Sequence, residues 1–434
     1  MKHSRYNINI NYKSINYLYN LLTNSIISIS ESLQYKIDNK EFELIETSQL
    51  NKLIELGFIL NDDKSEIELL KYLHNSVKYD YHQRSFIVYP TLKCNLDCPY
   101  CFEKIDRKGM NLKQLSVLRD FLINQAEENK LTFFHVRWSG GEPLLLWNYI
   151  NKTNELLREI CNKKETKFTT SLCTNGTLIK TEKIAKEIYK SEFEKITISI
   201  DGDKQTNNQR RYYKGNRGAY DDILRGVNNL SAFQKVILRV NIDKFNIPHF
   251  EDLLKDLENS LKYKSNISLY IKPVTAAWGC DYDDSLYKDS DFYKVETSLI
   301  ELALKYNFNV EIHPGFKHHT RCIIYQVGSF LIDPELHLYK CPLHMGTKSE
   351  RVGYINENSE AIIDNQIASI NFTNLSPFEN TECLKCKVLP LCNGKCSEKW
   401  KQLNCEENQG CIPEKETIIE KIKNFIIPIY IDNV

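Results

Sequence analysis

The sequence predicts an α/β protein built on a partial (β/α)6 TIM-type barrel, with a small N-terminal α+β domain and a cysteine-rich C-terminal domain held by metal. Three observations predict this arrangement: short strand-like runs and two helical patterns fill the first 80 residues, strands and helices then alternate, and cysteines crowd the end. Because a domain averages about 150 residues, we expect three domains, at residues 1–84, 85–315 and 316–434.

The N-terminal segment combines strand-like and helix-like patterns. Residues 25–32, "SIISISES", resemble a strand. A helix is expected from Ser48 to Leu56, because Gly57 can adopt the left-handed conformation that ends helices. A second helix is expected from Ser65 to Lys78, where apolar residues recur at helical spacing. These patterns predict a small separate domain.

The middle of the chain alternates between strands and helices. The first strand is expected at 85–92, "SFIVYPTL", and the first helix at 112–128. Further strands are expected at 131–139, 167–175, 195–201, 235–242 and 267–274, and helices at 148–162, 181–190, 219–232, 249–262 and 292–306. Such an alternation predicts a parallel sheet with right-handed crossovers, curled into part of a barrel, whose chemistry lies at the carboxyl ends of the strands.

Three cysteines follow the first barrel strand. The segment "TLKCNLDCPYCFE" places Cys94, Cys98 and Cys101 on one loop, with no histidine nearby. A closed structural zinc site needs four ligands, whereas a [4Fe-4S] cluster held by three thiolates leaves one iron open to chelate a substrate. A zinc site completed by a distant residue is the alternative.

The charge balance and the N-terminus exclude several classes of protein. Lys plus Arg and Asp plus Glu both number 57, so no net field attracts nucleic acid or an acidic membrane. We find neither a secretory signal pattern nor a run of about 20 apolar residues, and therefore expect a cytoplasmic protein with no membrane segment. In that reducing compartment the 14 cysteines favour metal binding or catalysis over disulfides.

The CxxxCxxC spacing, with Tyr100 before and Phe102 after the last cysteine, resembles the signature of the radical S-adenosylmethionine (SAM) superfamily. In that family the open iron binds SAM, and an electron from the cluster cleaves SAM to a 5′-deoxyadenosyl radical that abstracts a hydrogen atom. The cofactor supplies the difficult chemistry, and the protein orients it. The resemblance implies a low-potential electron donor such as flavodoxin or ferredoxin.

Motifs at later strand ends extend the resemblance. "WSGGEPLL" resembles the turn that meets the SAM amino group, where glycines permit close approach. Arg211 matches the arginine that neutralises the SAM carboxylate, although Asn207 and Asn208 replace the usual His-Asp. Asn175 and Asn241 are equally explained as ordinary turn or strand-end residues. The resemblance implies a SAM site formed by Tyr100, Gly140, Gly141, Glu142, Pro143, Ser199, Arg211 and Asn241.

The C-terminal cysteines have the spacing C-x2-C-x5-C-x3-C, which alone is also typical of a zinc ribbon. With their neighbours they resemble the seven-cysteine SPASM domain, which carries two auxiliary [4Fe-4S] clusters, so that three clusters are implied in all. The resemblance assigns Cys322, Cys341 and Cys396 to the first auxiliary cluster and Cys383, Cys386, Cys392 and Cys411 to the second. Cys405 is an alternative to Cys411, and Leu336 stands where the family usually has glycine. We expect Cys161, Cys173 and Cys280 to be small buried apolar residues.

The combination of radical SAM and SPASM motifs in this chain resembles chiefly two groups of enzymes that modify peptides or proteins. One group matures ribosomally made peptides by forming thioether or carbon–carbon crosslinks, and the other oxidises a Cys or Ser of sulfatases to formylglycine. The second group carries an Asp after the second SPASM cysteine, where this chain has Pro342, and begins almost directly at the cluster loop.

We therefore expect a peptide maturase whose N-terminal domain captures the leader of a precursor peptide as an added strand. In the alternative, that domain merely covers the barrel mouth. A more distant alternative is a zinc-organised protein that binds nucleic acid without catalysis.

Overall fold

The computed structural model describes residues 1–61, 65–101, 103, 108–274, 289–312, 322–374, 376–394 and 414–432. Cys280, Cys396, Cys405 and Cys411 lie outside these residues. The chain forms two compact units, each built from segments distant in sequence. We call Asp80–Glu311 with Cys322–Asn374 the barrel unit, and Met1–Tyr79 with Ile312–Arg321 and Leu375–Val434 the terminal unit.

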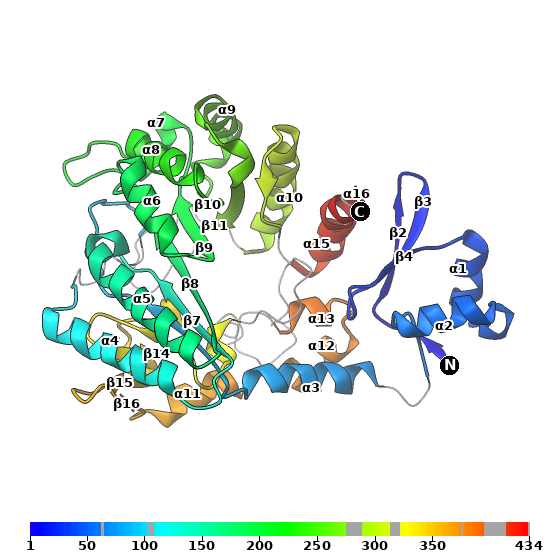
Figure 1. Ribbon diagram of the computed structural model, residues 1–434. Coiled ribbons are helices and arrows are strands. Elements are labelled where there is room, and N and C mark those ends of the chain that lie inside the picture. The colour runs from blue at the N-terminus through cyan, green and yellow to red at the C-terminus, as the bar shows by residue number, and fades with distance from the viewer. Residues whose placement is uncertain are drawn as a thin grey trace. The chain divides into compact units, whose positions relative to one another are not determined.

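The barrel unit contains the alternation that the sequence predicts, and Figure 1 shows helices lying along the sheet. The six expected strands are β6 (Gln83–Val88), β7 (Phe133–Trp138), β8 (Lys167–Thr174), β9 (Lys195–Ser199), β10 (Val236–Ile242) and β11 (Ile267–Pro273). The helices are α4 (Leu112–Glu127), α5 (Trp147–Lys163), α6 (Glu182–Lys190), α7 (Lys204–Arg210), α8 (Tyr220–Ser231), α9 (Phe250–Ser260) and α10 (Asp289–Lys305). Neighbouring strands from β6 to β11 pair in parallel, so the predicted α/β barrel class is confirmed.

Local sequence explains how these elements begin and which way their side chains face. Helix α4 starts with a capping box, in which Asn111 Oδ1 accepts from the Gln114 backbone N–H at 2.9 Å and the Gln114 side chain accepts from the Asn111 N–H. On β7, Trp138 is fully buried against α5, where its Nε1 donates to Asn154 Oδ1 at 2.9 Å. Side chains alternate along a strand, so Arg137 points to the opposite, inner face of the sheet.

The sheet continues beyond the six barrel strands. Strand β12 (Asn309–Val310) pairs with β11, and on the other side β13 (Phe330–Ile332) pairs in parallel with β6. Strands β14 (His337–Tyr339), β15 (Gly353–Ile355) and β16 (Ala361–Ile362) follow in antiparallel order. A segment that the sequence places in the C-terminal domain thus extends the barrel sheet, followed by α11 (Gln366–Thr373).

The terminal unit begins with a three-stranded antiparallel sheet of β2 (Asn7–Tyr12), β3 (Ile15–Asn20) and β4 (Ile26–Ser28). Beside it lie α1 (Glu31–Asp38), α2 (Thr47–Glu55), α3 (Glu66–Lys78) and the strand pair β1 (Lys2–His3) and β5 (Ile59–Leu60). Helices α2 and α3 confirm the two predicted helices, and Gly57 has the expected positive φ of 82°. The strand expected over 25–32 stops at Ser28, because Ser30 caps α1 by accepting from the Leu33 N–H at 3.2 Å.

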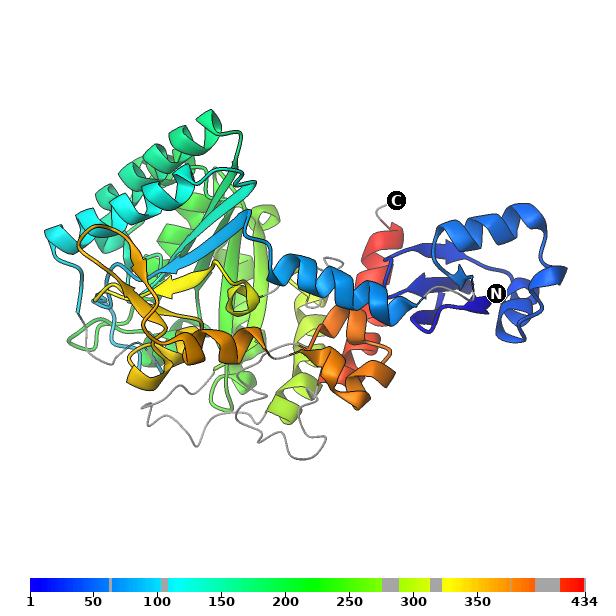
Figure 2. The same cartoon turned by 90° about the horizontal axis from the view of Figure 1, so that it is seen from below.

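Both faces of the β2–β3–β4 sheet are covered within the terminal unit. Leu18 packs into a core with residues of α1 and α2, including Ile37 and Leu53. On the other face, Ile8 and Tyr19 share a core with C-terminal residues. These come from α12 (Thr381–Lys385), α13 (Leu389–Cys392), α15 (Glu414–Lys421), the π-helix Ile422–Ile426 and α16 (Ile427–Asp432). The N-terminal residues and the C-terminal helices therefore share one of these two cores, and Figure 2 gives a second view of these elements.

Short 3-10 turns complete the fold, at Phe42–Leu44, Pro143–Leu146, Ile247–His249, Lys264–Asn266, Ile323–Tyr325, Pro342–His344, Lys348–Glu350 and Pro377–Glu379. Among the described residues, the search for a helix with the length and apolar character of a membrane span finds none.

Candidate active site

The cluster loop gathers three thiols after β6. Cys98 is 8% exposed, and Cys94 Sγ accepts from the Leu96 backbone N–H at 3.4 Å. The pKa of Cys94 is raised to about 11 and that of Cys101 to about 12, chiefly by burial, with smaller contributions from a nearby carboxylate, Glu142 or Glu103, and from the other cluster-loop cysteines. Thiols desolvated in this way are stable when protonated and release protons when a metal binds. The donor set fits an iron–sulfur cluster with three protein ligands.

The Gly-Gly-Glu turn after β7 packs directly on the backbone that leads into Cys94. The Gly141 N–H donates to the Thr91 carbonyl at 3.0 Å, and a Cβ at Gly141 would lie 2.5 Å from the carbonyl oxygens of Leu92 and Lys93. Gly140 has a φ of +116°, which favours glycine. The close approach that these glycines permit is therefore to the chain itself, and Pro143 begins the short helix that follows.

The Glu142 carboxylate joins its own turn to the end of β8 and the turn that follows. Its carboxylate is fully buried and accepts from the Leu144 N–H at 3.0 Å, from Thr174 Oγ1 at 2.7 Å and from the Asn175 N–H at 2.7 Å. Burial raises the pKa of Glu142, and these hydrogen bonds oppose the rise. Asn175 in turn donates to Asn95 Oδ1 at 2.8 Å, which connects the turn after β8 to the cluster loop.

Arg211 lies beside the cluster loop. Its Nη1 donates to the Tyr100 hydroxyl at 2.6 Å and lies 3.5 Å from Asp201 Oδ2, and the Tyr100 hydroxyl donates to the same carboxylate. Arg211 is 7% exposed, and its Nε has no hydrogen-bond partner among the described residues. The guanidinium is close enough to interact electrostatically with Cys98. A buried cation with an unused donor fits an anionic ligand.

Asn241 and Ser199 lie on the neighbouring strand ends. Asn241 donates through its backbone N–H and Nδ2 to Asp201 Oδ1, at 3.2 and 3.0 Å, and accepts from Arg239 Nε at 2.8 Å. Ser199 is in register with Arg239. All the predicted SAM-site residues therefore lie at the carboxyl ends of β6, β7, β9 and β10 or on the loops that follow them.

The residues that replace the family's His-Asp pair have structural partners. Asn207 Oδ1 accepts from the Asp201 N–H at 3.0 Å, and Asn208 Oδ1 accepts from the Tyr220 N–H at 3.0 Å. Arg210, next to Arg211, pairs with Asp243 at 2.6 Å. Both adjacent arginines contact Tyr100 of the cluster loop: the Arg210 guanidinium lies over its ring, 4.8 Å from the centroid, whereas Arg211 donates to its hydroxyl.

Several inner-face residues were missed by motif-based reasoning. Arg137 Nη2 lies 2.9 Å from Cys173 Sγ, so Cys173 is half-buried beside a guanidinium rather than packed among apolar groups as expected. Burial raises the pKa of Glu103 to about 7, and Arg137 and Arg239 both oppose that rise. Cys161, in contrast, is fully buried as expected. The period-two alternation of "FHVRWS" was the available signal for Arg137.

The predicted auxiliary ligands fall in both units. In the barrel unit, Cys341 is 7% exposed and shares a small core with Tyr325, which follows the exposed Cys322 by one turn. In the terminal unit, Cys383, Cys386 and Cys392 all pack against the core that contains β2 and β3. The assigned partners Cys396 and Cys411 lie outside the described residues. The three thiols that pack against this core have the donor chemistry that an iron–sulfur cluster requires.

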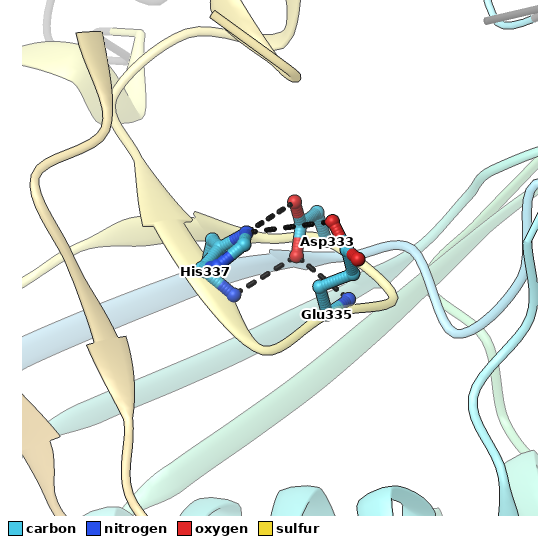
Figure 3. A group of neighbouring side chains, drawn as sticks. All are labelled: Asp333, Glu335 and His337. Atoms are coloured by element: carbon cyan, nitrogen blue, oxygen red, sulfur yellow. Dashed lines mark hydrogen bonds and ion pairs between the residues drawn. The ribbon is translucent and has the colours of Figure 1, made fainter. Parts of the chain in front are cut away.

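Asp333, Glu335 and His337 form another group of metal-ligand types, drawn in Figure 3. They lie on the hairpin between β13 and β14, where Asp333 Oδ1 accepts from the backbone N–H groups of Glu335 at 2.8 Å and His337 at 2.9 Å. His337 Nδ1 lies 3.2 Å from Asp333 Oδ2, and this hydrogen bond raises the pKa of His337. These contacts stabilise the turn.

The parallel barrel places three thiols and a buried guanidinium at the carboxyl ends of its strands, a set of groups that fits an iron–sulfur cluster and an anionic ligand beside it. Residues 88–257 match the model of the Radical SAM superfamily, so this part of the chain is a radical SAM domain. The family implies a [4Fe-4S] cluster and SAM as cofactors. The resemblance that the sequence motifs indicated is confirmed.

Two curated relatives bear on the family. The chain is 26% identical over 339 residues to the cysteine-type anaerobic sulfatase-maturating enzyme of Clostridium novyi. This match covers 70% of this chain and 84% of that enzyme. It is 31% identical over 176 residues to an uncharacterized protein of Methanocaldococcus jannaschii, which covers 40% of this chain and 58% of that protein.

Two solved structures share the fold. Native anSMEcpe with bound AdoMet and Kp18Cys peptide matches with a TM-score of 0.59 and 20% identity, over 81% of this chain and 100% of that one. Streptococcus suis SuiB bound to precursor peptide SuiA matches with a TM-score of 0.54 and 16% identity, over 94% of this chain and 97% of that one. At these identities the likeness shows the fold alone.

Proposed function

We propose that this radical SAM enzyme modifies a ribosomally made precursor peptide, forming a crosslink or a related change. The observation that carries the proposal is the three-stranded β2–β3–β4 sheet of the terminal unit. Its two faces are covered by the cores described above, so β2 and β4 are the edges to which a further strand could be added. An uncovered edge strand recruits an extended peptide through backbone hydrogen bonds. The relatives' printed activities and the peptide-bound fold neighbours support the substrate class.

In the radical SAM domain, Cys94, Cys98 and Cys101 would hold the SAM-binding [4Fe-4S] cluster, which supplies hydrogen-abstracting radical chemistry when SAM is bound and an external low-potential donor is present. Arg211, oriented by Tyr100 and Asp201, would neutralise the SAM carboxylate. Asn241 and Ser199 would contact SAM from the ends of β10 and β9. Of these groups, Tyr100, Arg211 and Asn241 are buried, which strengthens electrostatic interactions with a bound ligand.

We place the leader on strand β4. The Ile29 N–H donates to Asn16 of β3 at 2.8 Å and the Ser25 carbonyl accepts from the Asn20 N–H at 2.9 Å, so the N–H of Ser28 points away from the sheet. Ile26 and Ile27 are half-buried and offer apolar contacts on either side of this edge. A leader strand would therefore gain both backbone hydrogen bonds and side-chain contacts at β4.

Point variants test leader capture better than truncation, because deleting the first 79 residues would expose the core that they share with the C-terminal helices. Ser28→Pro removes one edge donor without removing a hydrogen bond to β3. Asn9→Pro is the matched control on the opposite edge strand, β2. The Tyr6 carbonyl accepts from the Leu21 N–H, and bonding to β3 alternates along β2, so the Asn9 N–H also points away from the sheet. The probe is a labelled precursor peptide encoded by a short reading frame beside the gene. We expect Ser28→Pro to weaken its binding to the full-chain enzyme about tenfold, equivalent to about 1.4 kcal/mol. Equal affinities of both variants and the wild type would refute capture at β4.

Sulfatase maturation is the second candidate function, and the Clostridium novyi relative favours it. Against it stands Pro342 after Cys341, where the sulfatase-maturating group carries an Asp. Mass spectrometry after incubation with a sulfatase-derived cysteine peptide, and separately with the precursor, distinguishes the two. Conversion of the sulfatase peptide alone to formylglycine would overturn the proposal.

The full set of metal centres is also open to a direct test. We propose three [4Fe-4S] clusters, with the auxiliary pair held by the SPASM-like cysteines. Anaerobic reconstitution should then give about twelve iron and twelve sulfide per chain. Colourless protein loaded with zinc would instead favour a metal-organised binding protein.

A further inference from the structure

Tyr6 carries a buried hydroxyl without a hydrogen-bond partner. The residue precedes β2 and its side chain is fully buried in the core of the terminal unit. In the described part of the chain, its Oη finds no donor or acceptor. A buried polar group that lacks a partner costs about 1–3 kcal/mol, so such groups are rare in folded proteins. This hydroxyl therefore points to a group that is bound beside it.

The neighbours of Tyr6 identify the kind of group. Cys383, Cys386 and Cys392 pack half-buried against the same core as the Tyr6 ring. Burial raises the pKa of Tyr6, and interaction with Cys386 is among the causes that raise it further, which places the phenol within electrostatic range of that thiol. The hydroxyl that lacks a partner and the three thiols, which are soft metal ligands, therefore belong to the same core.

We propose that the Tyr6 hydroxyl donates a hydrogen bond to a sulfur atom of the iron–sulfur centre held by Cys383, Cys386 and Cys392. The inference rests on the proposed function, which includes this auxiliary centre. Thiolate and sulfide sulfurs accept hydrogen bonds, and such bonds raise the reduction potential of the centre because they stabilise its more negative, reduced form. Tyr6, directly before the first strand of the sheet that we propose to bind the leader, would then tune an electron acceptor.

Tyr19 offers a matched control in the same core. It is 1% exposed and belongs to the same group of packed side chains as Tyr6. Its hydroxyl, however, donates to Asn24 Oδ1 at 2.6 Å. Replacing either tyrosine with Phe removes one oxygen from the core, but only Tyr6→Phe removes the proposed donor to sulfur.

The test is a redox titration of the full chain followed by electron paramagnetic resonance. The titration uses a background in which Cys94, Cys98 and Cys101 are replaced by alanine, so that the SAM-binding cluster gives no signal. The signal of the proposed auxiliary centre is then identified as the one that Cys386→Ala abolishes. Tyr6→Phe should make reduction of this centre about tenfold less favourable, a fall of about 59 mV for one electron. Tyr19→Phe should leave the potential unchanged. Equal potentials in the two variants would overturn the inference.

A second measurement does not require a Tyr6 variant. Pulsed electron–nuclear double resonance on the reduced, otherwise wild-type centre should detect a strongly coupled proton that exchanges in D2O, and its absence would contradict the hydrogen bond. A centre that holds zinc and no iron would contradict the proposed function as well. Iron-loaded protein whose potential does not respond to Tyr6→Phe would contradict this inference alone.

Discussion

The Nη1 atom of Arg211 lies 2.6 Å from the hydroxyl of Tyr100, the residue directly before Cys101. This contact joins a residue that follows α7 to the cluster loop, and Asp201 Oδ2 accepts from both side chains. The arginine that we propose for the SAM carboxylate is thus oriented by the loop that would hold the cluster. SAM binding and cluster binding are therefore expected to depend on each other.

Tyr100→Phe should weaken SAM binding without removing a cluster ligand. The variant removes a hydrogen bond to a charged group, worth about 1.5–3 kcal/mol, so the Kd for SAM should rise about 10- to 100-fold. Calorimetric titration of reconstituted protein with SAM measures the change. Tyr213→Phe, which loses a hydroxyl contact to Asp222 at 2.8 Å, serves as the control. An unchanged Kd in Tyr100→Phe would show that Arg211 needs no such support.

Gly141→Ala should disturb the cluster loop through backbone contact. The added methyl group would lie 2.5 Å from two carbonyl oxygens just before Cys94, and overpacking of this kind costs about 1–3 kcal/mol. Urea unfolding and iron retention under a chelator both report the effect. At Gly215, where φ is +96° and nothing lies within 4 Å of a new Cβ, alanine meets backbone strain alone. If Gly141→Ala lost iron no faster than Gly215→Ala, a steric effect of residue 141 on the cluster loop would be excluded.

His135 should make the protein sensitive to acid. Burial lowers the pKa of His135 to about 4, and its ring nitrogens lie 2.7 Å from Thr169 Oγ1 and 3.1 Å from Ser171 Oγ. Below the unfolded pKa of about 6.5 the unfolded chain binds a proton that the folded chain does not, so stability falls as the pH drops from about 6.5 to 4, by up to about 3 kcal/mol. His135→Gln should reduce the loss of unfolding free energy between pH 7 and pH 5. Identical pH slopes for variant and wild type would exclude this role.

Leu336→Val should destabilise the β13–β14 hairpin. Leu336 has a φ of +65° at the position where related sequences usually carry glycine, and a β-branched residue tolerates this conformation worse than leucine. We expect a loss of about 2 kcal/mol in unfolding free energy. Leu338→Val, at a fully buried strand position nearby, removes the same methylene group without the backbone penalty. A loss no larger than that of Leu338→Val would mean that the turn relaxes.

Local patterns made the barrel and the cluster loop predictable, because strand and helix periods, turn glycines and cysteine spacing are all read within short windows. The β2–β3 hairpin was missed: its turn residues Lys13 and Ser14 both have positive φ but lack the glycine or asparagine that usually marks such turns. The shared core of the two termini was also missed, because contacts such as that of Tyr19 with C-terminal residues leave no local signal. Arg137 and Cys173 belong to no motif, and only the pairing of β7 with β8 brings them together.

The central claim is that Cys94, Cys98 and Cys101 together hold the cluster that cleaves SAM. The most direct measurement is 5′-deoxyadenosine formed by anaerobically reconstituted, chemically reduced protein supplied with SAM, quantified by liquid chromatography. The account predicts steady formation by the wild type and by Cys386→Ala, and none by any of the three single alanine variants of the cluster loop. Undiminished 5′-deoxyadenosine from a cluster-loop variant would contradict it.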